Sequence, residues 1–184
     1  MNKKYELTTE TKLIDGHTVY RIKALKSFVT IIGRRVNKGD LGGWVESEAN
    51  LSHDGTCWLF DEAAGYENSR RYDNSVGYEN SRQSGDSRQY GDSRQSGDSR
   101  QFGNSRQSGD SHQFGSSWQS GYSRQFGNSW QAGYSRQYGA SQQYGNSQQF
   151  GNSQQYGDSE QYGDSWQSGV SRQITGYDDG TGAF

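Results

Sequence analysis

The sequence predicts an all-β protein in which a small β-rich cap precedes a long coiled repeat, a parallel β-solenoid. Three observations support this prediction. Aliphatic residues are concentrated before residue 65, so an ordinary layered core is available only to the front of the chain. An Asp-Gly pair stands between two β-prone runs near the N-terminus. From about residue 59 a six-residue period continues almost to the C-terminus, and such a strict period indicates a repeat architecture.

The cap is predicted to occupy residues 1–58. Its segment "KLIDGHTVYRIKAL" has Asp15 and Gly16 between two runs of β-prone residues, the composition of a tight hairpin turn. The segment "SFVTII" is a further short strand candidate. The following "NKGDLGGWVESEANLS" is typical of a turn-rich crossing, in which Gly39, Gly42 and Gly43 permit unusual backbone angles.

The repeat array is predicted to occupy residues 59–175. Serine recurs at every sixth position from Ser69 to Ser171, 18 times in all, and glutamine stands two residues later without a gap from Gln83 to Gln173, 16 times. The consensus hexad is G-[D/N]-S-[R/W/Q]-Q-[Y/F/S]. A short acidic tail, 176–184, follows, and we expect it either to cover the last coil weakly or to leave an edge for end-to-end self-association.

The front of the chain carries "YRIKAL…GDLGGWVESEANLS…G…CW" between Tyr20 and Trp58, and Gly-Asp or Gly-Asn pairs recur through the array. This combination resembles hexapeptide-repeat proteins of the polymer-forming (YdcK-like) type of bacteria and phages. The cap matches closely and the array matches in its spacing. The resemblance implies a left-handed, triangular solenoid in which three hexads, about 18 residues, make one coil. One aliphatic and one small residue of each hexad would then point inward.

The chain departs from that family pattern at both inward slots. Where the family has valine, this sequence has Gly65, Arg71, Gly77 and then glutamine, and where the family has alanine it has serine. Leu59 and Ala63 still follow the family pattern, so the departure begins at Gly65. Substitution at two fixed slots indicates a specially adapted or engineered polar core.

A polar interior of this kind requires that its amides find partners, because an unpartnered buried amide costs about 1–3 kcal/mol. Identical glutamines stacked at the strand spacing can form amide ladders, and serine hydroxyls can donate and accept along the same columns. The opposite register is worse, since it would bury unpaired arginines. The predicted inward ladder consists of Gln83, Gln89, Gln95, Gln101, Gln107, Gln113, Ser87, Ser93, Ser99 and Ser105.

The outward slots are predicted to carry arginine and aromatic columns, in which ring stacking and arginine–ring contacts stabilise the surface. Counting in steps of three hexads places Tyr66 at the start of one column. The exposed aromatic residues of the other predicted column are Tyr72, Tyr90, Phe126, Tyr144 and Tyr162.

Candidate catalytic and metal-binding residues are few. Hexapeptide proteins are often acyltransferases that use a histidine base and coenzyme A, but here only His17, His53 and His112 are available, and His112 stands in an outward slot. The array also lacks the interrupting loop and C-terminal helix of those enzymes. Cys57 is the single cysteine, in an apolar context that favours a buried small side chain. We therefore expect no enzyme activity, no metal site and no cofactor.

The charge distribution argues against nucleic acid as a partner. Residues 66–184 carry ten Arg and twelve acidic residues, so a basic groove is missing despite the alternation of arginine with aromatic residues. Residues 1–40 carry nine Lys or Arg and four acidic residues, which makes the cap basic. That basic excess is typical of a solvated surface. The alternative interpretation is a docking face for an acidic protein partner of unknown identity.

The composition leaves a rival class open. Gly, Ser, Gln, Tyr and Arg in these proportions are also typical of prion-like, low-complexity chains that stay disordered and form condensates. No apolar run approaches the length of a membrane span, and no hydrophobic stretch follows the basic start, so we expect cytoplasmic synthesis without a signal peptide. The expected function is structural or binding: a rigid rod, fibre segment or scaffold, virion-associated if the phage resemblance holds.

Overall fold

A computed structural model of the chain shows an all-β protein. It describes residues 3–73, 75–79 and 81–83, and beyond them the backbone of a series of two-residue strands that ends at 177–178. The side chains of those later strands are described only at positions 89, 95, 101, 107, 113, 119, 125 and 131. Within the described residues there is no α-helix, and one 3-10 helix, η1 (Glu48–Asn50), is present.

The cap is built on the predicted hairpin. Strand β1 (Tyr5–Ile14) pairs antiparallel with β2 (His17–Ala24), with Ile14 opposite His17. Asp15 and Gly16 both have positive φ angles, 49° and 89°, as the two central residues of a type I′ hairpin turn require. The prediction of a hairpin at this pair is therefore confirmed. The "SFVTII" segment contributes only the short strand β3 (Phe28–Val29), which pairs with β4 (Arg35–Val36).

The glycines of "GDLGGWV" have two different roles. Gly39 has a φ of 95°, as predicted for a turn. Gly42 and Gly43, however, lie inside strand β5 (Leu41–Val45) without positive φ angles, so the turn predicted there is wrong. Steric approach is the reason: a Cβ on Gly43 would lie 2.3 Å from the Ala63 carbonyl oxygen, and one on Gly42 would lie 2.6 Å from Ile22 and Trp58.

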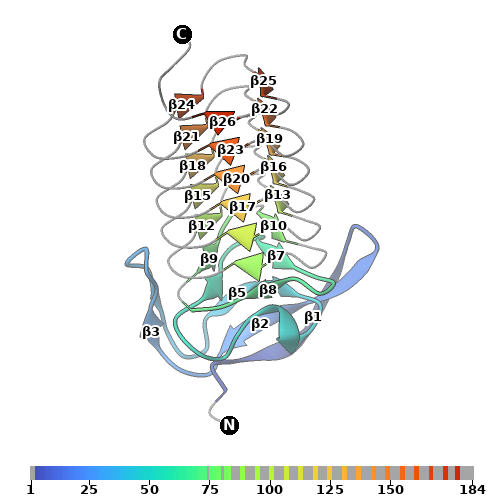
Figure 1. Ribbon diagram of the computed structural model, residues 1–184. Helices are drawn as coiled ribbons and strands as arrows, with labels where there is room; N and C mark the ends of the chain where they lie inside the picture. The colour runs from blue at the N-terminus through green and yellow to red at the C-terminus, as the bar shows by residue number, and fades with distance from the viewer. Residues whose placement is uncertain are drawn as a thin grey trace.

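Beyond β5 the chain places successive strands in three sheets in rotation (Figure 1). One sheet continues the cap strands β1, β2 and β5 through β7 (Ala64–Gly65), β10 (Arg82–Gln83), β13 (Arg100–Gln101), β16 (Trp118–Gln119), β19 (Arg136–Gln137), β22 (Gln154–Gln155) and β25 (Arg172–Gln173). The second contains β8 (Arg70–Arg71), β11 (Arg88–Gln89), β14 (Arg106–Gln107), β17 (Arg124–Gln125), β20 (Gln142–Gln143), β23 (Glu160–Gln161) and β26 (Tyr177–Asp178). The third contains β6 (Trp58–Leu59), β9 (Val76–Gly77), β12 (Arg94–Gln95), β15 (His112–Gln113), β18 (Trp130–Gln131), β21 (Gln148–Gln149) and β24 (Trp166–Gln167).

Strand pairing within the array is parallel and regular. Arg82 lies opposite Arg100, and Gln83 opposite Gln101, so each strand pairs with the strand three hexads later. The sequence separation between paired residues is slightly longer where the cap joins the array, since Val45 lies opposite Gly65. It is slightly shorter at the other end, where Gln161 lies opposite Asp178. Strand pairing therefore extends into the range 176–184, which the sequence analysis assigned to the tail.

The apolar core lies where the cap meets the first strands of the array. Its fully buried members come from both segments and include Ile22, Val45, Leu51, Trp58 and Leu59. Backbone hydrogen bonds also join the cap to the array in this region: Trp44 N donates to Ala63 O (2.9 Å), and Ser52 N donates to Arg71 O (2.9 Å). The cap thus pairs with the first strands of the array through β5 and contributes to the apolar core, here called the apolar base. The array continues from that base (Figure 1).

Candidate functional site

The interior of the array is lined by glutamine. Every glutamine side chain that the structure describes there is fully buried: Gln83, Gln89, Gln95, Gln101, Gln107, Gln113, Gln119, Gln125 and Gln131. The period of two along each short strand explains this placement, because the residue before each glutamine must face the other side. At β10, the one strand among these for which both side chains are described, Gln83 is buried and Arg82 is partly exposed.

Two of these amides donate to backbone carbonyls, and the predicted amide ladder stays a prediction. Gln83 Nε2 donates to Arg70 O (3.2 Å), and Gln95 Nε2 donates to Arg82 O (2.8 Å). Both acceptors are backbone carbonyls in a neighbouring sheet. The Oε1 atoms of Gln101 and Gln107 accept no hydrogen bond, although both residues have interaction partners. Gln83 Nε2 and Gln95 Nε2 thus each have a backbone acceptor, and Gln95 Oε1 also accepts from Arg71 Nη2.

The other predicted site residues fall into two groups. Ser87, Ser93, Ser99, Ser105, Tyr90, Phe126, Tyr144 and Tyr162 lie outside the described residues. Three serines of the same frame, Ser69, Ser75 and Ser81, are described and all are buried. Tyr72 is half-buried, and its hydroxyl accepts a hydrogen bond from Arg70 Nη1 (3.4 Å).

Tyr66 was predicted to begin an exposed column, and this prediction is wrong. Its side chain is only 5% exposed. The tip of the β1–β2 hairpin covers it: the Tyr66 hydroxyl donates to Asp15 Oδ2 (2.7 Å), and the ring packs 5.1 Å from the His17 imidazole. The hairpin extends over the first strands of the array, which a count by hexads could not show.

Gly65, Arg71 and Gly77 form one interior layer, here called the arginine layer. The three residues occupy equivalent positions in β7, β8 and β9, and all are buried. A Cβ on Gly77 would lie 2.7 Å from Arg71 Nη1, so the guanidinium occupies the space that a side chain at position 77 would need. The layer separates the apolar base from the glutamine-lined interior.

Arg71 is fully buried and reaches the next strands of two sheets. Its Nη1 donates to Gln89 Oε1 (2.5 Å) and its Nη2 to Gln95 Oε1 (2.8 Å). Burial lowers the pKa of the guanidinium to about 9, so the group keeps its positive charge at neutral pH. Within the described part of the chain the charge therefore meets amide oxygens and no carboxylate. Burying an uncompensated charge is expensive, by several kcal/mol even after relaxation.

A second buried cation lies at the base. Lys4 Nζ donates to Cys57 Sγ (3.1 Å) and to Asp54 O (3.3 Å). Burial lowers the pKa of the Lys4 ammonium and raises the pKa of the Cys57 thiol. Cys57 is fully buried, in agreement with the apolar context read from the sequence, but its lysine partner was not foreseen. The contact fastens the start of β1 to the loop before β6.

The three histidines occupy different environments. His17 Nδ1 lies 3.2 Å from Glu46 Oε1 and its Nε2 lies 3.2 Å from Glu67 Oε1. His53 packs on the Tyr5 ring at 4.4 Å, and its Nδ1 accepts from the Lys4 backbone amide. The backbone of His112 lies in β15, and its side chain is outside the described residues. His17 and His53 both face carboxylates of the cap region and serve its packing.

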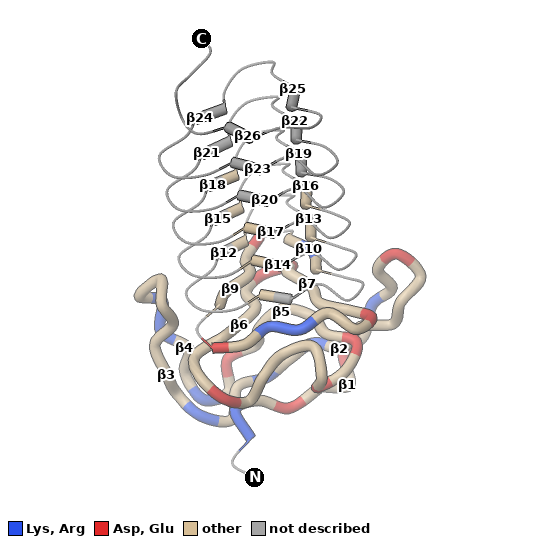
Figure 2. The backbone as a smooth tube through the Cα atoms, viewed as in Figure 1, with Lys and Arg blue, Asp and Glu red and all other residues tan. Residues whose placement is uncertain are grey.

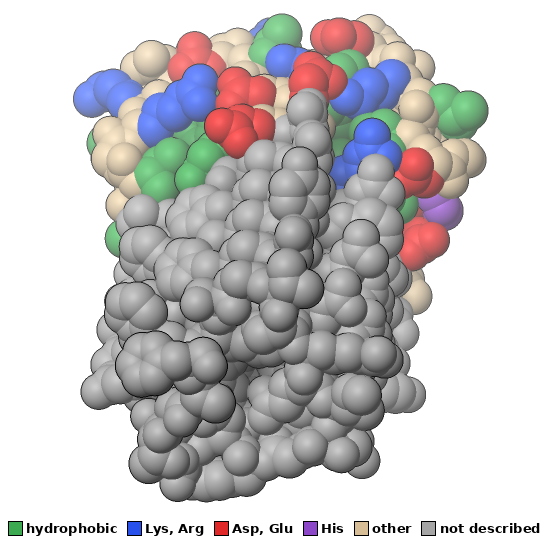
Figure 3. Space-filling view, turned by 90° about the horizontal axis from the view of Figure 1, so that it is seen from above, with side chains coloured by type: hydrophobic (Ala, Val, Ile, Leu, Met, Phe, Trp, Pro, Cys, Tyr) green, Lys and Arg blue, Asp and Glu red, His purple; other side chains and the backbone are tan. Residues whose placement is uncertain are grey.

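The surface of the cap carries both charges, interspersed (Figures 2 and 3). Several of its cations have carboxylate partners, among them Lys3 with Glu48 (2.7 Å). The basic excess of residues 1–40 is thus compensated in part by acids from 41–65. A surface pocket of about 250 Å³ on the cap is lined by Arg34, Arg35, Val36, Asp40, Leu41, Trp58 and Phe60.

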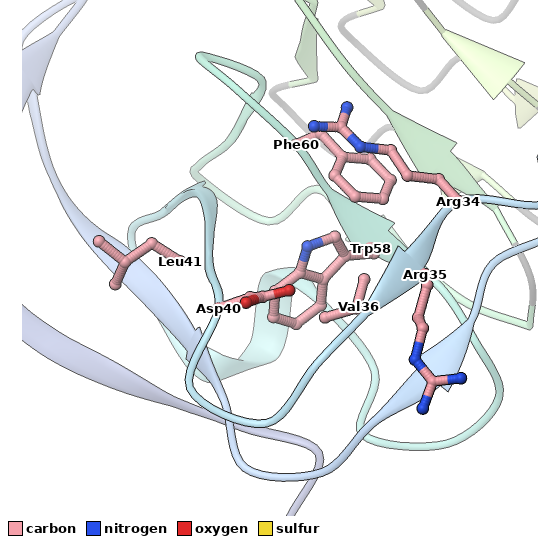
Figure 4. Close-up of a pocket in the computed structure, with 7 residues that line it drawn as sticks. All are labelled: Arg34, Arg35, Val36, Asp40, Leu41, Trp58 and Phe60. Carbon is pink, nitrogen blue, oxygen red and sulfur yellow. The ribbon is translucent and has the colours of Figure 1, made fainter.

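Figure 4 shows the guanidinium of Arg34 against the Phe60 ring, and that of Arg35 directed away from Trp58. Arg34 lies 4.1 Å from the ring centroid and pairs with Asp61 (3.6 Å). The Asp40 carboxylate accepts a hydrogen bond from the Asn37 backbone N–H (2.7 Å). The charged groups of Arg34 and Asp40 are therefore engaged with residues beside the pocket, and the pocket identifies no ligand.

In the described ranges, no three or more His, Cys, Asp or Glu side chains come together in a way that could hold a metal ion. The described residues also contain no helix long and apolar enough to cross a membrane. No protein-family model matches the chain, and no curated protein is significantly similar to it.

Proposed function

We propose that this chain is a non-enzymatic structural or binding protein, a rigid left-handed parallel β-solenoid with a triangular cross-section. The observation that supports this proposal best is the repeated parallel pairing at a constant step of three hexads, which recurs from β6 to β25. Successive strands enter three sheets in rotation, as the faces of a triangular coil require. The resemblance of the cap to hexapeptide-repeat proteins supports the handedness.

Rigidity is expected from the same arrangement. Seven parallel strands at a spacing of about 4.8 Å span about 29 Å along each of the two seven-stranded sheets. Each coil contacts only its neighbours, so stability adds along the axis and the cap protects the first edge. We propose that the opposite end serves self-association, and that the cap faces a protein partner, in a virion if the protein is phage-borne.

The test is the shape and cooperativity of the full chain in solution. A rod gives a β-type circular dichroism spectrum, one cooperative thermal transition and an elongated particle by small-angle X-ray scattering. A coil spectrum with condensation on crowding would favour the low-complexity alternative. Binding of coenzyme A, lost in His112→Ala, would favour an acyltransferase. Filaments seen by electron microscopy at high protein concentration would support end-to-end association.

A further inference from the structure

The end of the array away from the cap has three sheet edges. Each of the three long sheets stops there at a two-residue strand, β25, β26 or β24 (Figure 1). Among the residues that the structure describes, no strand pairs with the outer side of any of these three. All three are therefore edge strands, and the backbone N–H and C=O groups of an edge strand are a template for pairing with another chain.

The cap closes the opposite end. Strand β5 of the cap pairs with β7, where the first sheet enters the array. In the second sheet, Leu51 forms a β-bridge with Arg71 of β8. In the third sheet, Trp58 and Leu59 of β6 are only 1% and 0% exposed. Of the three long sheets, the first alone therefore has an accessible edge at the cap within the described residues, on the outer side of β1.

The far end lacks the features with which proteins keep sheet edges apart, chiefly lysine and proline on the edge strands. The chain has no proline, and its last lysine is Lys38. The three edge strands carry one base and one acid, Arg172 and Asp178, so their formal charge is zero. Residues 179–184 number one third of the 18 residues that separate paired strands, so they can pair with one of the three edges at most.

We propose that two copies of this chain join tail to tail through these edges, about a two-fold axis. A head-to-tail joint has only the β1 edge as a partner, whereas a tail-to-tail joint pairs three edges with three. A 180° rotation about an axis perpendicular to the array reverses the strands, so the new pairs are antiparallel. Such an interface is self-complementary and closed, so it gives a dimer and no filament. This inference rests on the proposed solenoid and names the partner at its free end.

The first test measures the mass and the length of the full chain. Sedimentation velocity over a concentration series should show the 20.6 kDa monomer and one larger species of twice that mass. In small-angle X-ray scattering the dimer should have about twice the maximum dimension of the monomer and the same cross-section. Filaments, or a dimer no longer than the monomer, overturn the two-fold joint. An elongated particle that stays monomeric overturns the dimer alone and leaves the rod intact.

The second test places charge on the edge strands. Trp166→Lys combined with Tyr177→Lys adds two positive charges to β24 and β26. Because juxtaposed like charges oppose association, we expect the dissociation constant of the dimer to rise by about tenfold or more. Gln142→Lys combined with Gln148→Lys is the matched control, since it adds the same charge to β20 and β21, which have partners on both sides. Equal effects of the two pairs overturn the proposal, and so does a chain that dimerises only after deletion of residues 179–184.

Discussion

Arg71 is the residue at which the interior changes from apolar to polar. Below it lie Leu51 and Leu59, and above it the first glutamines, two of which accept from its guanidinium. Both other positions of its layer are glycine, and the guanidinium occupies the space that a side chain at Gly77 would need. The two glycines are not equivalent, however, since only Gly77 is in steric contact with the guanidinium.

This difference gives a prediction at the residue scale. Gly77→Ala places a Cβ 2.7–2.9 Å from three atoms of the Arg71 guanidinium, which is fully enclosed and cannot move away freely. We expect a loss of about 1–3 kcal/mol in the free energy of unfolding, the usual cost of overpacking. Gly65→Ala is the control and should change stability by less than about 1 kcal/mol, because a Cβ there makes only ordinary contacts. Chemical denaturation measures both, and equal losses would contradict the steric account.

At the scale of elements, the β1–β2 hairpin is fastened to the array at its tip. Asp15 accepts from the Tyr66 hydroxyl (2.7 Å) and from Arg82 Nη1 (3.0 Å). Farther along the hairpin, Lys12 and Arg21 both pair with Glu62 in the turn before β7, and both lie over the Trp44 ring. The hairpin therefore has two attachments that can be tested separately.

The tip contact predicts the effect of Tyr66→Phe. The variant keeps the ring against His17 and loses one hydrogen bond to a partly exposed carboxylate, so we expect a cost of about 1 kcal/mol. Amide hydrogen exchange should increase at the turn between β1 and β2 and stay unchanged in β5. Tyr20→Phe is the matched control in the same hairpin, because the Tyr20 hydroxyl makes no hydrogen bond within the described residues. A comparable increase in both variants would argue against an attachment at the tip.

The second attachment predicts a dependence on pH. The Lys12 ammonium, with Arg21 nearby, lowers the pKa of the Glu62 carboxyl in the folded protein. A carboxylate whose pKa is lowered by folding stabilises the protein above its unfolded pKa, about 4.3, and loses that contribution as the pH falls. We expect the melting temperature to decrease below about pH 5, and Glu62→Gln to reduce that decrease. Glu10→Gln, in strand β1 without an ion pair in the described residues, should leave the pH profile unchanged.

The sequence predicts the turns and the periodic strands well. It predicts poorly which side chains are covered by segments distant in sequence. The turn at Asp15 and Gly16 follows from two adjacent residues, and the all-β parallel strands follow from a period that needs no knowledge of the cap. Tyr66 and Gly43 were misjudged because their environment is set by strands distant in sequence: the hairpin tip covers the tyrosine, and the Ala63 carbonyl excludes a Cβ. The Lys4–Cys57 contact also joins distant segments, so no spacing could indicate it.

At the scale of the whole molecule, the regular strand pairing predicts that three hexads can be removed as one unit. Each strand pairs with the third strand after it, so three successive hexads contribute one strand to each of the three sheets. Removal of three hexads shortens every sheet equally and leaves the inward frame of glutamine intact. Removal of half that length exchanges the inward and outward residues beyond the junction.

A pair of deletions tests this prediction. Deletion of residues 101–118 joins Arg100 to Gln119 and preserves the hexad frame, whereas deletion of 101–109 joins Arg100 to Asp110 and shifts the frame by half a hexad. We expect the first variant to keep a cooperative thermal transition and to be shorter by about 4.8 Å in scattering, since one strand per sheet is lost. The second should lose cooperativity or aggregate, because Asp110 enters an inward slot. If both deletions melt alike, the strands do not depend on the three-hexad step, and stability must come from the cap alone.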